Sequence, residues 1–282
     1  MPMKKSKRNK YILIICLIWM QSMILSPRQM AITFDDLPVV FSGRHDESTQ
    51  KQIVNQILQV LDKHRIKAAG FATGNKLKSP YHFELLKTFV SKGHLLGNHS
   101  FSHFDLNRSD IKHYWKDILK CEKIIDPLMG PVKYFRYPLL HRGDSNEKKQ
   151  AIYRLLRENH YKIAPVSIDN DDYSFNLPVI KAHRNRDIRA LKKLKKKYVD
   201  HILERIFYFE ELSKRKIGRG MKHILLLHMN FLNSMFLDDL LTHLRNEGWV
   251  FIHLEEALTD PVYQLEDRYC GKKGLGWLER IK

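Results

Sequence analysis

Two acids and two histidines, far apart in the sequence, have the types and spacing of metal ligands. His99 and His103 stand four positions apart, which places two side chains on the same side of one helical turn. Asp35 and Asp36 follow an apolar run, where adjacent carboxylates are costly to bury without a cation. Asp36, His99 and His103 would supply three N/O ligands, which leaves one position open in catalytic zinc sites. The alternatives are a chance histidine pair and a helix-capping aspartate.

Four residues besides the three ligands would complete a hydrolytic site. Asp35 would take a proton from a water molecule activated by the metal, and Arg136, at the end of a later predicted strand, would keep that carboxylate ionised. His228 ends the apolar run 224–227 and would protonate an amine leaving group, with Asp172 orienting its imidazole. The alternative for His228 is a histidine whose hydrogen bonds are satisfied at a strand end. The combination favours metal-assisted amide hydrolysis.

The elements that must position these residues alternate between strands and helices. This alternation is typical of an α/β fold with a mostly parallel sheet, whose chemistry lies beyond the carboxyl ends of the strands. With no internal repeat or low-complexity linker, we expect one domain. Apolar runs predict strands at 30–34, 68–73, 94–97, 134–136, 163–168, 223–228 and 250–254. Apolar residues three and four apart predict helices at 49–64, 81–92, 110–125, 148–159, 181–213 and 235–247.

Residues 1–25 are expected to lie outside this fold. Basic residues precede an apolar run at 11–25, which is the layout of an export signal. The run is short for a membrane span and no clear small-residue cleavage site follows it, so a signal peptide and an N-terminal membrane anchor both stay open. Residues 26–282 are then the catalytic domain of an exported, envelope-associated protein. After cleavage only Cys121 and Cys270 would remain, which permits one disulfide.

The formal net charge of +18 is unevenly distributed. Residues 181–222 contain 15 Lys or Arg against 5 Asp or Glu, and most of the remaining chain is nearly neutral. No base-stacking aromatic motif accompanies this segment, so nucleic acid is not an expected partner. We expect a long helix with a solvated basic face; the alternative is attraction of this face to an anionic envelope surface.

Five short motifs occur at the ends of predicted strands, within residues 30–258. They are Thr33-Phe34-Asp35-Asp36, His99-Ser100-Phe101-Ser102-His103, Arg136-Tyr137-Pro138, Asp169-Asn170-Asp171-Asp172-Tyr173 and Leu226-Leu227-His228. In this order they resemble the motifs of the polysaccharide deacetylases, the NodB-homology family of carbohydrate esterases. The resemblance implies a distorted (β/α) barrel, here with a long basic helical segment, and a divalent metal that is commonly zinc, with cobalt, nickel or manganese as other choices.

The resemblance also implies a role for each matched residue. Leu139 replaces the aromatic residue often found in the third motif, and its backbone N–H would still help to hold an oxyanion. Tyr173 replaces the usual tryptophan of the fourth motif and would form a smaller wall of the sugar groove. The other implied roles are metal binding for Asp36, His99 and His103, base for Asp35, partner of the base for Arg136, acid for His228 and tuning carboxylate for Asp172.

The implied activity is removal of N-acetyl groups from an amino-sugar polymer, such as peptidoglycan, chitin or another N-acetylglucosamine glycan, with release of acetate. One alternative is a related metal hydrolase that acts on a non-sugar amide or an ester, because ligands define a reaction better than a substrate. The other is an envelope polysaccharide-binding protein with a catalytically weak site. The motifs carry no prediction of the oligomeric state.

Overall fold

A single parallel sheet organises the protein. The computed structural model describes residues 27–40 and 45–281, so the predicted signal or anchor at 1–25 lies outside the described residues. Within these ranges the strand order is β5-β4-β3-β2-β1-β6, with β7 beside the beginning of β1, and every pairing is parallel. The strands are β1 (Arg28–Leu37), β2 (Ala69–Ala72), β3 (Leu95–Asn98), β4 (Lys133–Phe135), β5 (Tyr161–Ile163), β6 (Lys222–His228) and β7 (Trp249–Phe251).

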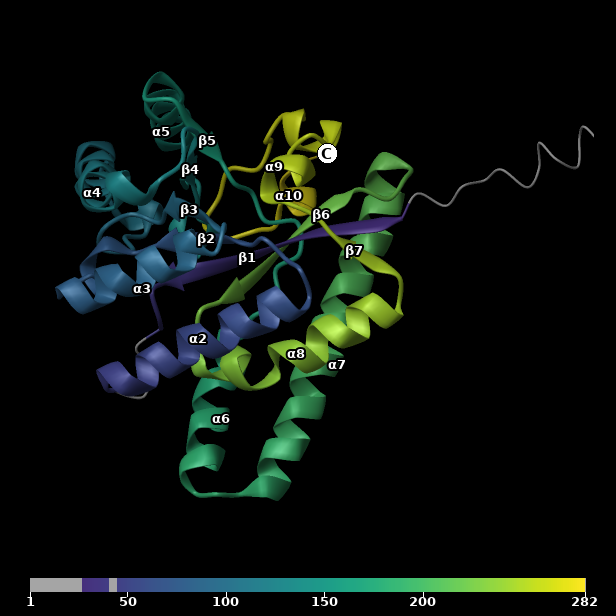
Figure 1. Cartoon of the computed structure of the whole chain (residues 1–282). Helices are drawn as coiled ribbons and strands as arrows, with labels where there is room; N and C mark the ends of the chain where they lie inside the picture. The colour runs from purple at the N-terminus through teal and green to yellow at the C-terminus, as the bar shows by residue number, and fades with distance from the viewer. Residues whose placement is uncertain (1–26, 41–44, 282) are drawn as a thin grey trace, which may run out of the picture.

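Helices connect the strands and lie outside the sheet (Figure 1). Apolar residues at helical spacing turn inward, and polar side chains mark several helix starts; Asp46, for example, accepts a hydrogen bond from the Thr49 N–H at 2.7 Å. The α-helices are α2 (Glu47–Lys63), α3 (Pro80–Ser91), α4 (Ile111–Ile125), α5 (Asn146–Glu158), α6 (Tyr173–Arg184), α7 (Ile188–Ile217), α8 (Phe231–Asn246), α9 (Leu254–Ala257) and α10 (Trp277–Arg280). None of the described helices is both long and apolar enough to span a bilayer.

An irregular segment, residues 164–168, leads from β5 toward β6, the two strands at opposite ends of the strand order. The strand predicted at 163–168 was wrong: β5 ends at Ile163, and the chain then crosses toward β6. Pro165 has no N–H to donate to a ladder, which agrees with this interruption. At Ile168 a parallel bridge forms to Leu225 of β6, and the Leu226 N–H donates to the Ile168 carbonyl at 3.1 Å. The predicted α/β fold with a distorted barrel is therefore confirmed.

The single long helix predicted at 181–213 was also wrong, because two helices share this stretch. Helix α6 ends at Arg184, Arg186 takes a positive φ of 54°, and the Asp187 side chain caps α7 by accepting from the Ala190 N–H. In Figure 1 the two helices form an antiparallel hairpin that extends away from the sheet. Asp187 carried the signal for this break, since aspartate is a preferred N-cap residue.

The C-terminal residues support the loop that contains the third motif. That loop forms the short 3-10 helix η4 (Pro138–Leu140), in which Leu139 has a φ of 56°. A Cβ atom on Gly274 would lie 2.0 Å from the Leu139 carbonyl oxygen, so the two backbones are in close contact. Nearby, Cys270 is free, as is buried Cys121, so the disulfide that the sequence permitted is not formed. The other 3-10 helices are η1 (Gly74–Lys76), η2 (Leu106–Arg108), η3 (Asp126–Leu128) and η5 (Pro261–Gln264).

We predict that Gly274→Ala destabilises the protein by about 1–3 kcal/mol, because the new methyl group would overlap a backbone oxygen. Urea denaturation monitored by circular dichroism measures the effect. Gly220→Ala is the matched control, since a Cβ there meets no atom within 4 Å. Equal stability of the two variants would contradict the close packing of Leu139 against Gly274.

Candidate active site

The register of the sheet brings the five motifs to one edge. Strands β1 and β6 are paired so that Asp35 lies directly opposite His228. Strands β3 and β4 pair at their last residues, so His99 and Arg136 both follow immediately beyond the sheet. Because parallel strands end on the same side, residues from four strand ends converge. This is where the sequence predicted the chemistry.

Asp36, His99 and His103 form a compact cluster of possible metal ligands. One ligand atom from each residue lies within 4.8 Å of the others, and this is the only such three-residue cluster in residues 27–40 and 45–281. The prediction that the two histidines share a helical turn was wrong, because residues 99–103 form a loop. Ser100 and His103 adopt positive φ values of 63° and 56°, and this backbone path places the two rings 5.0 Å apart.

The protonation of the two histidines suits metal binding. Nδ1 of His99 lies 2.8 Å from the Arg136 carbonyl oxygen, which can only accept, so Nδ1 carries the hydrogen and the Nε2 lone pair is available to a metal. Burial lowers the pKa of both His99 and His103 to about 4. Both imidazoles are therefore neutral near pH 7, as ligation requires. One carboxylate and two neutral imidazoles fit a divalent cation such as Zn²⁺.

Asp35 is buried and held by Arg136. Nη1 of Arg136 lies 3.2 Å from Asp35 Oδ1, while the same guanidinium donates to the Thr33 hydroxyl at 3.2 Å and to the Ala164 carbonyl at 2.6 Å. Burial raises the pKa of Asp35, and the charge of Arg136 opposes that rise. Asp35 Oδ2 also lies 3.7 Å from Nε2 of His99, so this carboxylate stands beside the ligand cluster.

Asp36 has a cationic partner that sequence reasoning missed. Nζ of Lys76, the last residue of η1, lies 2.8 Å from Asp36 Oδ1, and the Thr73 hydroxyl donates to the same oxygen at 3.0 Å. Burial would raise the pKa of Asp36, but Lys76 and then the two histidines lower it well below its usual range. No motif pointed to Lys76, because only the fold brings the end of β2 beside the end of β1.

His228 is held by a chain of buried polar groups. Its Nδ1 lies 2.5 Å from Asp172 Oδ1, and its backbone N–H donates to Asp172 Oδ2 at 3.0 Å. The Asn233 amide donates to Asp172 Oδ2 at 2.8 Å and in turn accepts from the Tyr198 hydroxyl at 2.6 Å. Burial alone would lower the pKa of His228, but the charge and hydrogen bond of Asp172 raise it to about 9. His228 is therefore protonated at neutral pH.

Helix α7 supports the loop that carries Asp172. Nε2 of His201 lies 2.6 Å from the Asn170 carbonyl, and Nε of Arg205 donates to the Asp169 carbonyl at 3.0 Å. Apolar residues on the same helix, including Ile202 and Phe209, are buried. The predicted basic segment thus has one face that packs under the active site, which its charge alone did not indicate.

The two predicted substrate contacts both lie at the surface. The Tyr173 side chain is 58% exposed, and its ring meets the His228 ring edge-on at 5.7 Å. Leu139 is 51% exposed and stands three residues after Arg136. Their roles in binding a sugar stay predictions.

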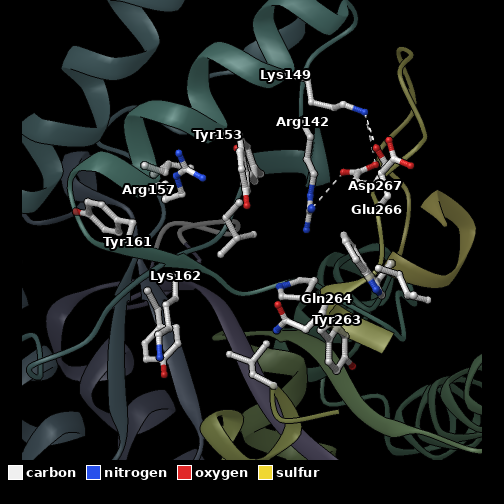
Figure 2. A pocket seen from close by; sticks show the side chains of 18 of the residues that line it. Arg142, Lys149, Tyr153, Arg157, Tyr161, Lys162, Tyr263, Gln264, Glu266 and Asp267 are labelled. Carbon is white, nitrogen blue, oxygen red and sulfur yellow. Dashed lines mark hydrogen bonds and ion pairs between the residues drawn. The ribbon is translucent and has the colours of Figure 1, made fainter. Parts of the chain in front are cut away.

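A separate cavity of about 860 Å³ lies between α5, β5 and the C-terminal residues (Figure 2). Tyr153 and Arg142 point into it, and Arg142 forms an ion pair with Asp267 at 3.2 Å. None of the predicted ligands or acid and base residues lines this cavity. We therefore place the chemistry at the strand ends, where ligands and perturbed titratable groups converge, and not in this cavity.

Comparison with known proteins agrees with this fold. The family model described as polysaccharide deacetylase matches residues 24–163. A peptidoglycan-N-acetylglucosamine deacetylase of Bacillus cereus is 32% identical over 146 residues, which are 51% of this chain and only 46% of that relative.

Two solved structures share the fold. The chitin deacetylase of the fungal pathogen Colletotrichum lindemuthianum superposes with a TM-score of 0.58 at 20% identity, over 83% of this chain and 88% of that one. A CE4 family pseudoenzyme from Bacillus anthracis superposes with a TM-score of 0.55 at 20% identity, over 83% of this chain and 66% of that one.

The fold and the strand-end site define a protein of the NodB-homology type, with a distorted parallel barrel. By this match, residues 24–163 belong to the polysaccharide deacetylase family. The resemblance inferred from the five motifs is thereby confirmed.

We predict that Asp172 makes the stability of the protein depend on pH between about 6.5 and 9. An unfolded histidine has a pKa near 6.5, and His228 is raised to about 9 in the fold. Its contribution is therefore complete below pH 6.5 and is lost as the pH rises through 9. Asp172→Asn should cost on the order of 3 kcal/mol at pH 6 and progressively less toward pH 9.

Urea unfolding of wild type and variant at pH 6, 7.5 and 9 measures this difference. Asp110→Asn is the matched control, because Asp110 and His113 form a solvent-exposed pair whose interaction water screens. A difference between wild type and Asp172→Asn that stays constant over this range would refute the coupling.

Proposed function

We propose that this protein is a metal-dependent deacetylase that removes N-acetyl groups from an amino-sugar polymer and releases acetate. The observation that carries the proposal is the placement of a three-ligand cluster beside two differently tuned groups, Asp35 and His228, at one edge of the sheet. Residues 26–282 form its catalytic domain. The family and the name of the Bacillus cereus relative support the deacetylase activity.

Asp36, His99 and His103 would bind the metal. Zn²⁺ is the first metal to test, followed by Co²⁺, Ni²⁺ and Mn²⁺. A divalent cation held there supplies a Lewis acid that polarises the acetamide carbonyl and makes water a stronger nucleophile. The Nδ1–H of His99 and the Arg136 carbonyl fix the orientation of one ligand ring.

Asp35 would accept the proton of the attacking water. The raised pKa of Asp35 lies closer to the pH at which the enzyme would work, as an efficient general base requires. Arg136 holds the Asp35 carboxylate in place by an ion pair. The Leu139 backbone N–H would help to stabilise the oxyanion, supported by the contact of Gly274 with the Leu139 carbonyl.

His228 would donate a proton to the sugar nitrogen as the carbon–nitrogen bond breaks. It is protonated at neutral pH because Asp172 stabilises the imidazolium, and Asn233 holds Asp172 in position. The exposed ring of Tyr173 stands against His228 and would stack on the sugar.

We further propose that the substrate is a cell-envelope glycan rich in N-acetylglucosamine, and that the protein is exported or anchored by its N-terminal segment. Peptidoglycan and chitin-like chains are the first substrates to test, because the Bacillus cereus relative is a peptidoglycan-N-acetylglucosamine deacetylase and one fold neighbour is a chitin deacetylase. Such substrates would reach an exported protein directly.

A glycan-binding protein with a weak site is the second candidate function. The specific observation in its favour is Lys76, whose ammonium contacts the carboxylate that would bind the metal. Under this candidate the protein would bind the polymer without releasing acetate. Acetate release therefore separates the two candidates.

We predict that wild type releases acetate from chito-oligosaccharides or peptidoglycan fragments, and that a chelator abolishes the release. Asp35→Asn should retain bound metal yet lose about 100-fold or more in kcat, because the proton acceptor is gone. Enzymatic acetate detection and elemental analysis give the two readouts. Release only from a non-sugar acetamide or an aryl acetate would favour the related hydrolase, and full activity of Asp35→Asn would remove Asp35 from the base role.

We also predict that His103→Ala weakens zinc binding at least tenfold, since it removes one of three protein ligands. Titration of metal-free protein with Zn²⁺ against a chromophoric chelator measures the affinity. His113→Ala, an exposed histidine on α4, is the matched control and should bind zinc like wild type. Equal affinities for all three proteins would exclude His103 as a ligand.

A further inference from the structure

Lys76 places a positive charge directly beside a proposed metal ligand, where it would repel a metal cation. Its side chain is 15% exposed, and its Nζ contacts Asp36 twice, at 2.8 Å to Oδ1 and 3.3 Å to the backbone oxygen. The Thr73 hydroxyl completes the hydrogen bonds to Oδ1. One oxygen of the proposed metal-binding carboxylate, Oδ1 of Asp36, therefore already has a cation and a hydrogen-bond donor from this protein.

Two ion pairs of the site are balanced without a metal. Two carboxylates, Asp35 and Asp36, face two cations, Arg136 and Lys76, through the ion pairs given above. His228 is in turn paired with Asp172. A dication bound to Asp36 would therefore join a carboxylate that already faces a cation of this protein.

This balance has two opposite consequences for stability and for metal binding. Without a metal, the ion pair with Lys76 relieves the cost of a buried Asp36 carboxylate. With a metal, the ammonium group and the dication share one carboxylate in a site where water screens poorly, so they repel each other. A neutral side chain at position 76 would remove both effects.

We propose that Lys76 is the counter-ion of Asp36 in the metal-free protein and sets the metal affinity of the site by competing with the dication for this carboxylate. The proposal rests on the metal site of the proposed function. It assigns Lys76 a role in metal affinity, separate from the proton transfers of Asp35 and His228. Zinc then binds reversibly to a site that is already folded and in which Asp36 is already paired with a cation.

The test compares zinc binding and metal-free stability in wild type, Lys76→Met, Lys76→Arg and Lys78→Met. Metal-free proteins are prepared by chelation and dialysis, then titrated with Zn²⁺ by calorimetry and melted with and without zinc. Lys78→Met removes the same charge from an exposed neighbour in the same loop. Lys76→Arg keeps a cation next to Asp36. If Lys76→Met does not fold, Lys76→Gln retains a hydrogen-bond donor and serves in its place.

We expect Lys76→Met to bind zinc at least tenfold more tightly than wild type, with a lower metal-free Tm and a larger rise in Tm on adding zinc. Lys76→Arg and Lys78→Met should stay within about threefold of the wild-type zinc affinity, a difference of roughly 0.7 kcal/mol or less.

Each remaining outcome has one meaning. Zinc affinity in Lys76→Met that is equal to or weaker than in wild type overturns the role of Lys76, while zinc binding by wild type leaves the proposed function standing. Zinc binding by Lys76→Met but not by wild type supports the competition and overturns metal-dependent catalysis in the natural protein. Failure of both proteins to bind zinc overturns the metal site and the inference together.

Discussion

Two adjacent carboxylates at the end of the central strand are the constraint around which the active site is built. Asp35 and Asp36 end a strand whose neighbours bury it, so each requires a cation or hydrogen-bond donors. Arg136 and Lys76 meet this requirement from the ends of β4 and β2. Neither cation is near these acids in sequence, and the parallel register is what brings them together.

The proton-donating side of the site depends on groups still farther from the chemistry. Tyr198 holds Asn233, Asn233 holds Asp172, and Asp172 holds His228, each through a buried hydrogen bond. Helix α7 supplies Tyr198 and also supports the loop of the fourth motif. This helix lies within the basic segment 181–222, for which contact with an anionic envelope surface was one interpretation of the sequence. Helix α7 thus has one face of exposed basic residues and another face that supports the active site.

Ion pairs within the protein compensate the carboxylates of the site when no metal is bound. Without a metal, Asp35 is paired with Arg136, Asp36 with Lys76 and Asp172 with His228, and the two ligand imidazoles stay neutral. The same ligand geometry can therefore belong to a strong hydrolase or to a protein that binds glycan and metal weakly, because ligand type alone does not set affinity. Under the proposal for Lys76, the electrostatic surroundings of Asp36 set the metal affinity of the site.

The sequence by itself determined the family, the alternation of strands and helices, and the residues with possible chemistry, because these depend on local periodicity and motif order. Only the tertiary structure decided how they meet. The histidine pair converges through a loop and not a helical turn, the predicted long helix breaks at a capped turn, and the strand predicted at 163–168 crosses to β6. Lys76 and Asn233 acquire their partners only through folding, since contacts across the sheet carry no sequence spacing that could reveal them.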